Sequence, residues 1–301
     1  ITSSTYFRTG SGEKLRVFIN DAGFKFHPHT IKLLDSKVSP ESFGRGQVPN
    51  LADFNGDGFL DLFVTRHAQM SSGQSNPRDQ KLGNGLYLSE GAWDVFRDVS
   101  AKMGIQNEKA YNRQPSIADV NKDGWLDLAI GCDNIKDAQG GFPHSRLYVF
   151  KPNGAKFTDG RFEDIGGTPL APDFGGFYHD SARDKAGPDI NLRDLDNDGD
   201  VDLIQSFHCD VLDLAALYSP IEYRQGVFCW KNLLAETGQF RFEKVTGNGL
   251  ACEARLRYDR TTKARTPGGK APGLPYVSLA DTDNDGGQDV LAVGPGMPGW
   301  A

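Results

Sequence analysis

The sequence predicts an all-β protein that is built from repeated strand–loop–strand units, and three observations support this. Short apolar runs rich in β-branched and aromatic residues recur along the 301 residues. The 36 Gly and 16 Pro supply the turns that such a fold needs. An acidic nine-residue loop of the form D-x-[DN]-x-D-G-x-x-D recurs four times, each time between two of the apolar runs. The loops span residues 53–61, 119–127, 194–202 and 281–289.

The acidic loops predict binding sites for a hard cation. Oxygen ligands at alternate positions, a Gly for a sharp turn and a final carboxylate are the components of a Ca²⁺ cage. The motif is not an EF-hand, because position twelve holds Val64, Ile130, Gln205 and Ala292 rather than a bidentate Glu. We expect up to four Ca²⁺ ions, bound by side-chain oxygens and one backbone oxygen per loop. The predicted ligand residues are Asp53, Asn55, Asp57, Phe59 and Asp61; Asp119, Asn121, Asp123, Trp125 and Asp127; Asp194, Asp196, Asp198, Asp200 and Asp202; and Asp281, Asp283, Asp285, Gly287 and Asp289.

Two of these loops, with the strands that follow them, resemble the FG-GAP/VCBS repeat family, whose members include the calcium-binding propeller blades of integrin alpha ectodomains. The resemblance rests on D-F-N-G-D-G-F-L-D-L-F-V from Asp53 and D-L-D-N-D-G-D-V-D-L-I from Asp194. The later hairpins that begin at Leu86 and Leu147 support it. The resemblance implies a β-propeller that binds calcium, and it is almost silent about activity.

A propeller blade has four antiparallel strands, and the acidic loop would join the first two. The first blade, about 45–108, is expected to have strands at 48–52, 62–65, 85–89 and 95–99. For the second blade, about 112–168, we expect strands at 116–118, 128–131, 146–151 and 161–165. For the third, about 187–249, we expect them at 190–192, 203–207, 227–232 and 239–245.

The fourth repeat has strands only at 276–279 and 290–293, where the sequence ends. Two further strands, at 15–20 and within 23–31, have no first half before them. We therefore predict that 275–301 and 13–34 form one blade together, which closes a four-bladed ring and leaves no open edge. The whole of 1–301 would then be one propeller domain. The alternative is that the chain is part of a seven-bladed ring.

Composition and cysteines indicate the compartment. No apolar run is long enough to cross a membrane, so no membrane span is expected. Calcium modules of this kind are typically extracellular, and we expect a secreted protein, extracellular or periplasmic. The preferred disulfide joins Cys209 and Cys229 across a hairpin, with Cys132–Cys252 as a further possibility. The alternative is four buried thiols.

Long connections predict the ligand-binding face. In a propeller, connections between the second and third strands and between blades lie on one face, and here they are the long ones, at 67–84, 133–145, 209–226, 170–189 and 250–275. Cations mixed with His and Tyr suit an anionic or hydroxyl-rich ligand such as a uronate-containing polysaccharide. The alternative is a solvated surface with packed His residues. The candidate ligand-binding residues are Arg66, His67, Tyr178, His179, His208, Tyr223 and Arg224.

Three functions fit this sequence. The first is a binding module that recognises a carbohydrate or a partner protein through the long loops. The second is a polysaccharide lyase, in which a His or Tyr removes a proton and an Arg neutralises the developing charge. The third is a structural subunit of an extracellular assembly. Motifs for nucleotide, haem or catalytic zinc are absent, and no nucleic-acid partner is expected. The candidate lyase residues are His208, His179, Tyr178, Arg66 and Arg183.

Overall fold

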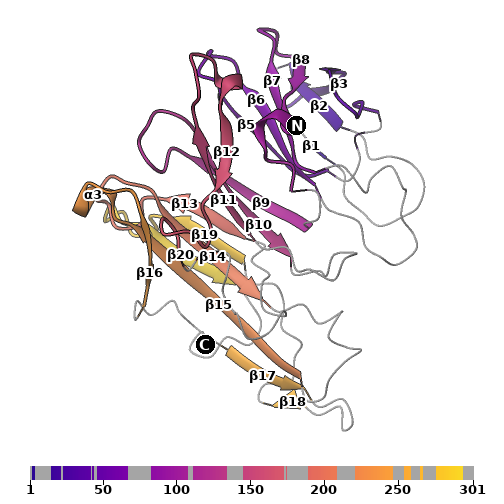
Figure 1. Ribbon diagram of the computed structural model, residues 1–301. Coiled ribbons are helices and arrows are strands. Elements are labelled where there is room, and N and C mark those ends of the chain that lie inside the picture. The colour runs from indigo at the N-terminus through magenta and orange to yellow at the C-terminus, as the bar shows by residue number, and fades with distance from the viewer. Residues whose placement is uncertain are drawn as a thin grey trace. The chain divides into compact units, whose positions relative to one another are not determined.

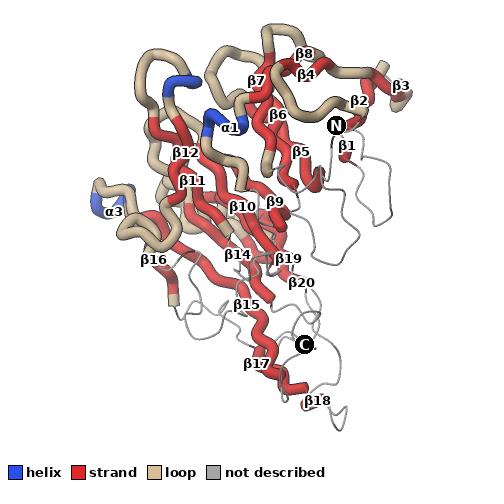
Figure 2. Tube along the Cα trace, turned by 45° about the vertical axis from the view of Figure 1, so that its right-hand side comes forward, coloured by secondary structure: helices blue, strands red, loops and turns tan. Residues whose placement is uncertain are grey.

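The predicted all-β class is confirmed by the computed structural model, in which strands dominate and helices are few and short (Figures 1 and 2). The structure describes residues 2–3, 15–21, 23–41, 43, 46–66, 83–107, 111–133, 145–172, 174, 189–208, 221–246, 254–258, 265–266 and 276–293. By their internal contacts, the residues divide into two compact units. The first comprises Ile1–Gln114 with Phe150–Glu163, and the second comprises Pro115–Val149 with Asp164–Ala301.

A five-stranded sheet forms most of the first unit, in the order β4–β8–β7–β6–β5. Strands β5 to β8 are antiparallel neighbours in sequence order, as expected for the first repeat, and the first acidic loop joins β5 to β6. Strand β4 pairs with β8 in the parallel direction. The bounds are β4 (Lys32–Leu34), β5 (Gly46–Ala52), β6 (Asp61–Arg66), β7 (Gly85–Ser89) and β8 (Val95–Asp98).

The second and third acidic loops also join the first two strands of their sheets. One sheet has the order β12–β11–β10–β9, and the other begins β13–β14–β15, with β16 also paired to β15. The bounds are β9 (Tyr111–Ala118), β10 (Asp127–Asp133), β11 (Arg146–Lys151) and β12 (Arg161–Asp164), then β13 (Ile190–Arg193), β14 (Asp202–His208), β15 (Ile221–Asn232) and β16 (Phe242–Val245).

Strand β15 corrects the predicted loop assignments. It is twelve residues long, and its first half extends beyond the sheet of the third repeat to pair with β17 (Ala254–Tyr258), which pairs in turn with β18 (Arg265–Thr266) (Figure 1). Tyr223 and Arg224 therefore lie in a strand, opposite Leu256 and Arg255, and not in a connecting loop. The reason is that backbone pairing with β17 satisfies the amides of this segment.

The described residues do not show the predicted ring closure. Strands β2 (Leu15–Asn20) and β3 (Phe26–His29) form a sheet with β1 (Thr2–Ser3). Strands β19 (Tyr276–Ala280) and β20 (Asp289–Val293), which carry the fourth acidic loop between them, pair with each other in a two-stranded sheet. No ladder joins these two sheets within the described ranges, so the blade count stays a prediction.

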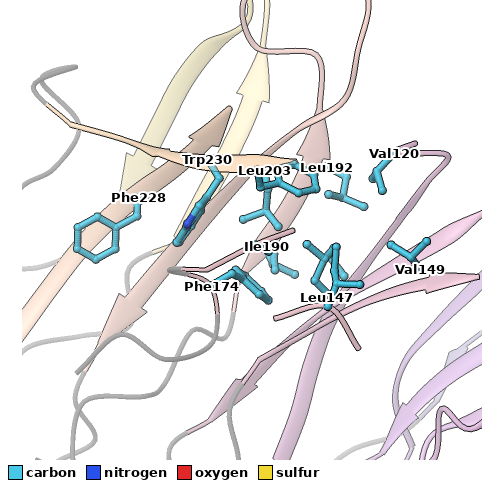
Figure 3. Packing of buried hydrophobic residues seen from close by; sticks show 13 residues of the cluster. Val120, Leu147, Val149, Phe174, Ile190, Leu192, Leu203, Phe228 and Trp230 are labelled. Carbon is cyan, nitrogen blue, oxygen red and sulfur yellow. The ribbon is translucent and has the colours of Figure 1, made fainter. Parts of the chain in front are cut away.

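Each unit has its own apolar core. In the second unit the core gathers residues from β10, β11, β13, β14, β15 and β16, and Trp230 and Phe174 pack edge to face with ring centroids 5.5 Å apart (Figure 3). In the first unit, the core forms around Phe43, Leu62 and Tyr87, which are all fully buried. Burial of these aromatic and branched side chains fixes the sheets that present the acidic loops.

The described helices are short turns, α1 (Ser100–Met103), the 3₁₀ turn η2 (Phe157–Asp159) and α3 (Leu234–Thr237). Among the described residues, no helix combines the length and apolar character of a membrane span. The predicted disulfides are not formed, because Cys132 and Cys229 are buried thiols. Cys229 packs with Ile204 and Val277 in a small apolar cluster, while Cys209 and Cys252 lie outside the described residues.

Candidate functional site

The four acidic loops share one backbone conformation. Position six is glycine in each copy, with φ of 87°, 88°, 90° and 93° in the order of the loops. These angles lie in the left-handed region, which glycine reaches without steric cost, so the backbone explains the G of the motif. Position four is also left-handed, with φ of 71° at Gly56, 56° at Lys122, 60° at Asn197 and 61° at Asn284. We refer to the copies as the first to fourth loops and number their residues from one to nine.

Backbone hydrogen bonds orient the side-chain oxygens of positions one and three. In every loop the position-six N–H donates to the position-one carboxylate, at 2.8 to 3.0 Å. In the first, second and fourth loops, the position-five N–H donates to side-chain oxygens of both position one and position three, at 3.0 to 3.2 Å. Oxygens that share one amide donor must lie close together, so the loop brings potential cation ligands to one point.

Position nine has a structural role that the motif alone does not reveal. In every loop its carboxylate accepts a hydrogen bond from the position-two N–H, at 2.8 to 2.9 Å. In the first and third loops its other oxygen accepts from the third strand of the sheet, where Ser89 and Asn232 donate at 2.8 Å. Asp61 and Asp202 are 0% and 2% exposed. These two residues therefore tie each loop to its sheet from a buried position.

Burial raises the pKa of both carboxyl groups, so a nearby positive charge is needed to keep them ionised. Loss of water raises the pKa of Asp61 to about 6, with smaller contributions from the charges of Asp57 and Asp53. The same cause raises the pKa of Asp202 to about 7, with Asp196 and Asp200 adding to the effect. A cation at the centre of the loop would favour the ionised carboxylates, so the electrostatics of the site fit a bound divalent ion.

The third and fourth loops bring several carboxylates within reach of one ion. Ligand oxygens lie within 4.8 Å of one another in the groups Asp194–Asp196–Asp202, Asp196–Asp198–Glu236 and Asp281–Asp283–Asp285. In the third loop, Asp194 Oδ1 and Asp200 Oδ1 are buried and accept no hydrogen bond. Hard oxygen donors of this kind suit Ca²⁺, which takes six to eight of them. Buried acceptors without donors are costly, so these oxygens fit the predicted ion.

The loops of the second unit are linked to one another. Asn232 donates through Nδ2 to the carbonyl of Val120 in the second loop, at 2.7 Å, while its backbone holds Asp202 of the third. Asn197 of the third loop donates to the carbonyl of Gly286 in the fourth, at 2.6 Å. Successive repeats therefore contact each other through their acidic loops, at the end of the sheets where the cations are expected.

Arg66 is the predicted ligand-binding residue that the structure describes most fully, and it is only 3% exposed. Its guanidinium lies over the ring of Phe43, 4.5 Å from the centroid. Nη1 donates to the carbonyl of Gly83 at 2.9 Å, and Nη2 donates to the hydroxyl of Tyr87 at 2.5 Å. Nε is buried and has no hydrogen-bond partner. Both acceptors are neutral, so among the described residues no carboxylate is hydrogen-bonded to this buried cation.

A cavity of about 200 Å³ adjoins Arg66. The residues that line it include Asn84, Tyr87, Ser100, Lys102 and Gln106. Burial raises the pKa of Tyr87, although the Arg66 charge acts in the opposite direction. Asp98 also borders the cavity, but it accepts hydrogen bonds from Ser36 and Ser100 at 2.5 to 3.0 Å. The cavity therefore offers donors and a buried positive charge to a small anionic group.

The remaining predicted ligand-binding and lyase residues are only partly placed. His208 is the last residue of β14 and pairs with Gln225 of β15. Tyr223 and Arg224 lie in β15, and the side chains of these three residues are not described. His67, Tyr178, His179 and Arg183 lie outside the described residues. The arrangement proposed for a lyase therefore stays a prediction.

Sequence reasoning missed Lys231, which forms ion pairs with the third loop, and Glu236, which forms an ion pair with Lys231. Nζ of Lys231 contacts carboxylates of Asp196, Asp198 and Glu236, at 3.3 Å for Asp198. Lys231 comes directly before the strand residue that holds position nine, so an alignment of the third strands would have identified it. Glu236 lies in the α3 turn, outside the strands, so an alignment of the strands would not have identified it.

Comparison with known proteins assigns no family to the chain. No family model matches it, and no curated protein matches it. Solved structures that match include a putative exo-beta-1,3-galactanase from Bifidobacterium bifidum s17. The two are 10% identical, with a TM-score of 0.29 over 84% of this chain and 98% of that chain. A likeness this distant carries no argument about fold or activity.

Proposed function

We propose that this chain is a calcium-stabilised β-repeat module that binds a carbohydrate or a partner protein outside the cell. The repeats would be FG-GAP/VCBS-type blades of a four-bladed propeller, or part of a seven-bladed ring. One observation carries the proposal. Four loops far apart in the sequence share the same two left-handed positions and the same hydrogen bonds to position one, which bring oxygen ligands together at four equivalent places.

Bound Ca²⁺ would supply two positive charges at the centre of each loop. The carboxylates of positions one, five and nine, the Asp or Asn side chain of position three and the backbone carbonyl of position seven would hold it. The role of the ions would be structural, because the loop oxygens are already committed to the ion and to backbone amides. The strand ends would thereby be pinned, which leaves the connections at the other end of the sheets for ligand binding.

Arg66 and its cavity support an anionic group as the ligand. A buried guanidinium with an unused Nε–H, whose acceptors in the described part of the chain are neutral, gains a strong charge-assisted hydrogen bond when a carboxylate enters. The cavity volume of about 200 Å³ accommodates one such group and not a whole polymer. We therefore propose a glycan that carries uronate carboxylates, with one carboxylate inserted beside Arg66.

Binding without turnover is favoured over a lyase at this position. A lyase needs a base beside the arginine, and within the described ranges the titratable side chain hydrogen-bonded to Arg66 is Tyr87. Burial raises the pKa of Tyr87, so its hydroxyl retains its proton and would donate to a ligand rather than remove a proton from it. A binding module accounts for Arg66 and Tyr87 without any further group.

The test is binding to matched acidic and neutral polysaccharides in the presence of Ca²⁺. We expect a uronate-rich polymer to bind and its carboxyl-reduced form not to bind.

Arg66→Met should weaken binding by roughly 10- to 100-fold, the value of one charge-assisted hydrogen bond of about 1.5–3 kcal/mol. Lys25→Met, which removes an exposed charge outside the cavity lining, is the control and should have little effect. Equal binding of both polymers, or an unaffected Arg66→Met protein with unchanged melting temperature, would contradict the proposal. Unsaturated products would indicate the lyase instead.

A further inference from the structure

The third loop differs from the first two in the residue that faces it from the neighbouring strand. The pairing of β6 with β7, β10 with β11 and β14 with β15 has the same register relative to the acidic loops. This register places Leu88, Val149 and Lys231 at equivalent points. Leu88 and Val149 are buried and apolar, whereas Lys231 brings a charge to the loop.

The ammonium of Lys231 lies among the predicted ligands of the third loop. Nζ is ion-paired with Asp196 Oδ2 and lies 3.3 Å from Asp198 Oδ2, which are positions three and five. Its third partner is Glu236 Oε1 from α3. The Lys231 side chain is 30% exposed and the Asp198 side chain 21% exposed, so this ion-paired group is only partly in contact with solvent. Partial burial strengthens the attraction relative to a surface pair.

An ammonium is an incomplete substitute for a divalent ion in this loop. It has three N–H donors, and the three carboxylates already in contact with it can use them all. Two buried oxygens of the same loop, Asp194 Oδ1 and Asp200 Oδ1, remain without a donor. Asp200 is fully buried, and its other oxygen accepts from the N–H of Ala235 at 2.7 Å. The loop therefore has more oxygen acceptors than Lys231 can satisfy.

We infer that Lys231 is an intramolecular competitor for the cation site of the third loop, and that Glu236 receives its ammonium when a divalent ion binds. This inference rests on the proposed calcium binding. An ion held by Asp196 and Asp198 would repel an ammonium in contact with the same carboxylates, so the two cations exclude each other. Glu236 lies outside the loop and can retain the ammonium after it leaves. The third loop is then the weaker site, which fills only at higher Ca²⁺ concentration than a loop without such a lysine.

The test is calorimetric titration of chelator-treated full-length protein with Ca²⁺. Asp194→Asn identifies the third loop, because position one is Asp in every loop and its loss should remove one class of sites from the isotherm. In Lys231→Met and Lys231→Gln, that class should bind about tenfold more tightly or better, since a unit charge at contact distance is removed from a partly buried site. Lys25→Met, which removes an exposed charge from the β2–β3 turn, should leave the isotherm unchanged.

A double-mutant cycle tests the role of Glu236. Glu236→Gln should weaken the third site while Lys231 is present, because the displaced ammonium loses its acceptor, and the effect should shrink several-fold in the Lys231→Met background. Additive effects of the two substitutions would overturn the part assigned to Glu236. Isotherms of Lys231→Met and wild type that superimpose, while Asp194→Asn still removes a site, would overturn the inference and leave the proposed calcium binding intact. A wild-type protein that binds no Ca²⁺ would refute both.

Discussion

The first and third acidic loops have the same backbone but different charge arrangements. The first has three aspartates, an Asn at position three and the apolar Leu88 beside it. Its Asn55 donates an amide N–H to Asp57 at 2.9 Å, so the loop partly satisfies its own carboxylates. The third has five aspartates, a neighbouring Glu236 and the counter-charge of Lys231.

This comparison separates what the motif specifies from what its surroundings specify. The left-handed glycine and the buried carboxylate of position nine occur in both loops, so they belong to the turn and its attachment to the sheet. The charge balance is set by residues outside the nine, on the third strand and in the α3 turn. Equivalent loops can therefore have one fold and different affinities for the same ion.

Removal of calcium should have the largest effect, because it removes the ion from every loop together. Each occupied site stabilises the folded state by about 2.7 kcal/mol when the free ion is at 100 times its Kd. We expect EDTA to lower the melting temperature by many degrees, and excess Ca²⁺, but not Na⁺ at equal ionic strength, to restore it. Differential scanning calorimetry measures the shift. A melting temperature that is indifferent to chelator would remove the basis for comparing the loops as metal sites.

Loss of the position-nine carboxylate should have the next largest effect on stability. The size of the effect should be similar in the first and third loops. Asp61→Asn and Asp202→Asn each replace an acceptor oxygen by an NH₂ group that faces a backbone N–H, at a cost of about 1–3 kcal/mol. The cost should persist in EDTA, because the bonds to the sheet need no ion.

Denaturant unfolding measures this cost. Asp57→Asn is the matched control in the first loop, because Asp57 is exposed, and in EDTA it should change the free energy of unfolding little. If Asp61→Asn were as mild as Asp57→Asn in EDTA, the position-nine carboxylate would be only a metal ligand.

The pH dependence of folding stability should also differ between the two loops, and this effect should be smaller than the loss of the position-nine carboxylate. The folded pKa values of about 6 for Asp61 and about 7 for Asp202 both exceed the value near 4 of an unfolded carboxyl group. A raised folded pKa favours the folded state at low pH, and this contribution is lost as pH rises from about 4 through 6 and 7. The metal-free protein should thus lose stability over this range, while the stabilisation by Ca²⁺ grows.

Melting curves between pH 5 and 8, with and without EDTA, test this prediction. Asp202→Asn should reduce the slope between pH 6 and 7 more than Asp61→Asn does, because the Asp202 pKa is higher. A gap between the calcium-loaded and chelated melting temperatures that does not change with pH would contradict the assignment of these carboxylates.

The smallest expected effect on Ca²⁺ affinity is in the second loop, which also offers an independent signal for the bound ion. Trp125 occupies position seven, where the predicted ligand is the backbone carbonyl. Tb³⁺ in this loop should therefore show luminescence sensitised by the indole. Trp125→Phe should abolish most of that emission and change the affinity for Ca²⁺ by less than about twofold, because the carbonyl remains. Emission that survives the substitution would show that the bound ion lies elsewhere.

The motif allowed the loops to be predicted because its information is local. A Gly at position six and alternate oxygen ligands specify the turn, and short flanking apolar runs specify the strands. Lys231 could not be found in this way, since its contact with Asp196 depends on the register of β15 against β14. The pairing of Tyr223 with Leu256 was missed for the same reason, because a partner strand more than thirty residues away decides it.

Two further predictions depended on pairing over long distances. Ring closure requires that β2 or β3 meet β19 or β20, and local patterns carry no information on whether they pair. The Cys229 disulfide was inferred from its place on a hairpin, but the side chain is buried with Ile204 and Val277. Packing of an apolar thiol in a core explains its position without a bridge.

The most direct test of the central claim is the number of Ca²⁺ ions that bind to the chelator-treated protein, measured by native mass spectrometry together with equilibrium dialysis. We expect up to four specifically bound ions, and the loss of one ion in each variant with Asp→Asn at position one of a single loop, starting with Asp53→Asn and Asp194→Asn. The claim would be contradicted by a protein that binds no Ca²⁺ at millimolar concentration, or by a stoichiometry that these substitutions leave unchanged.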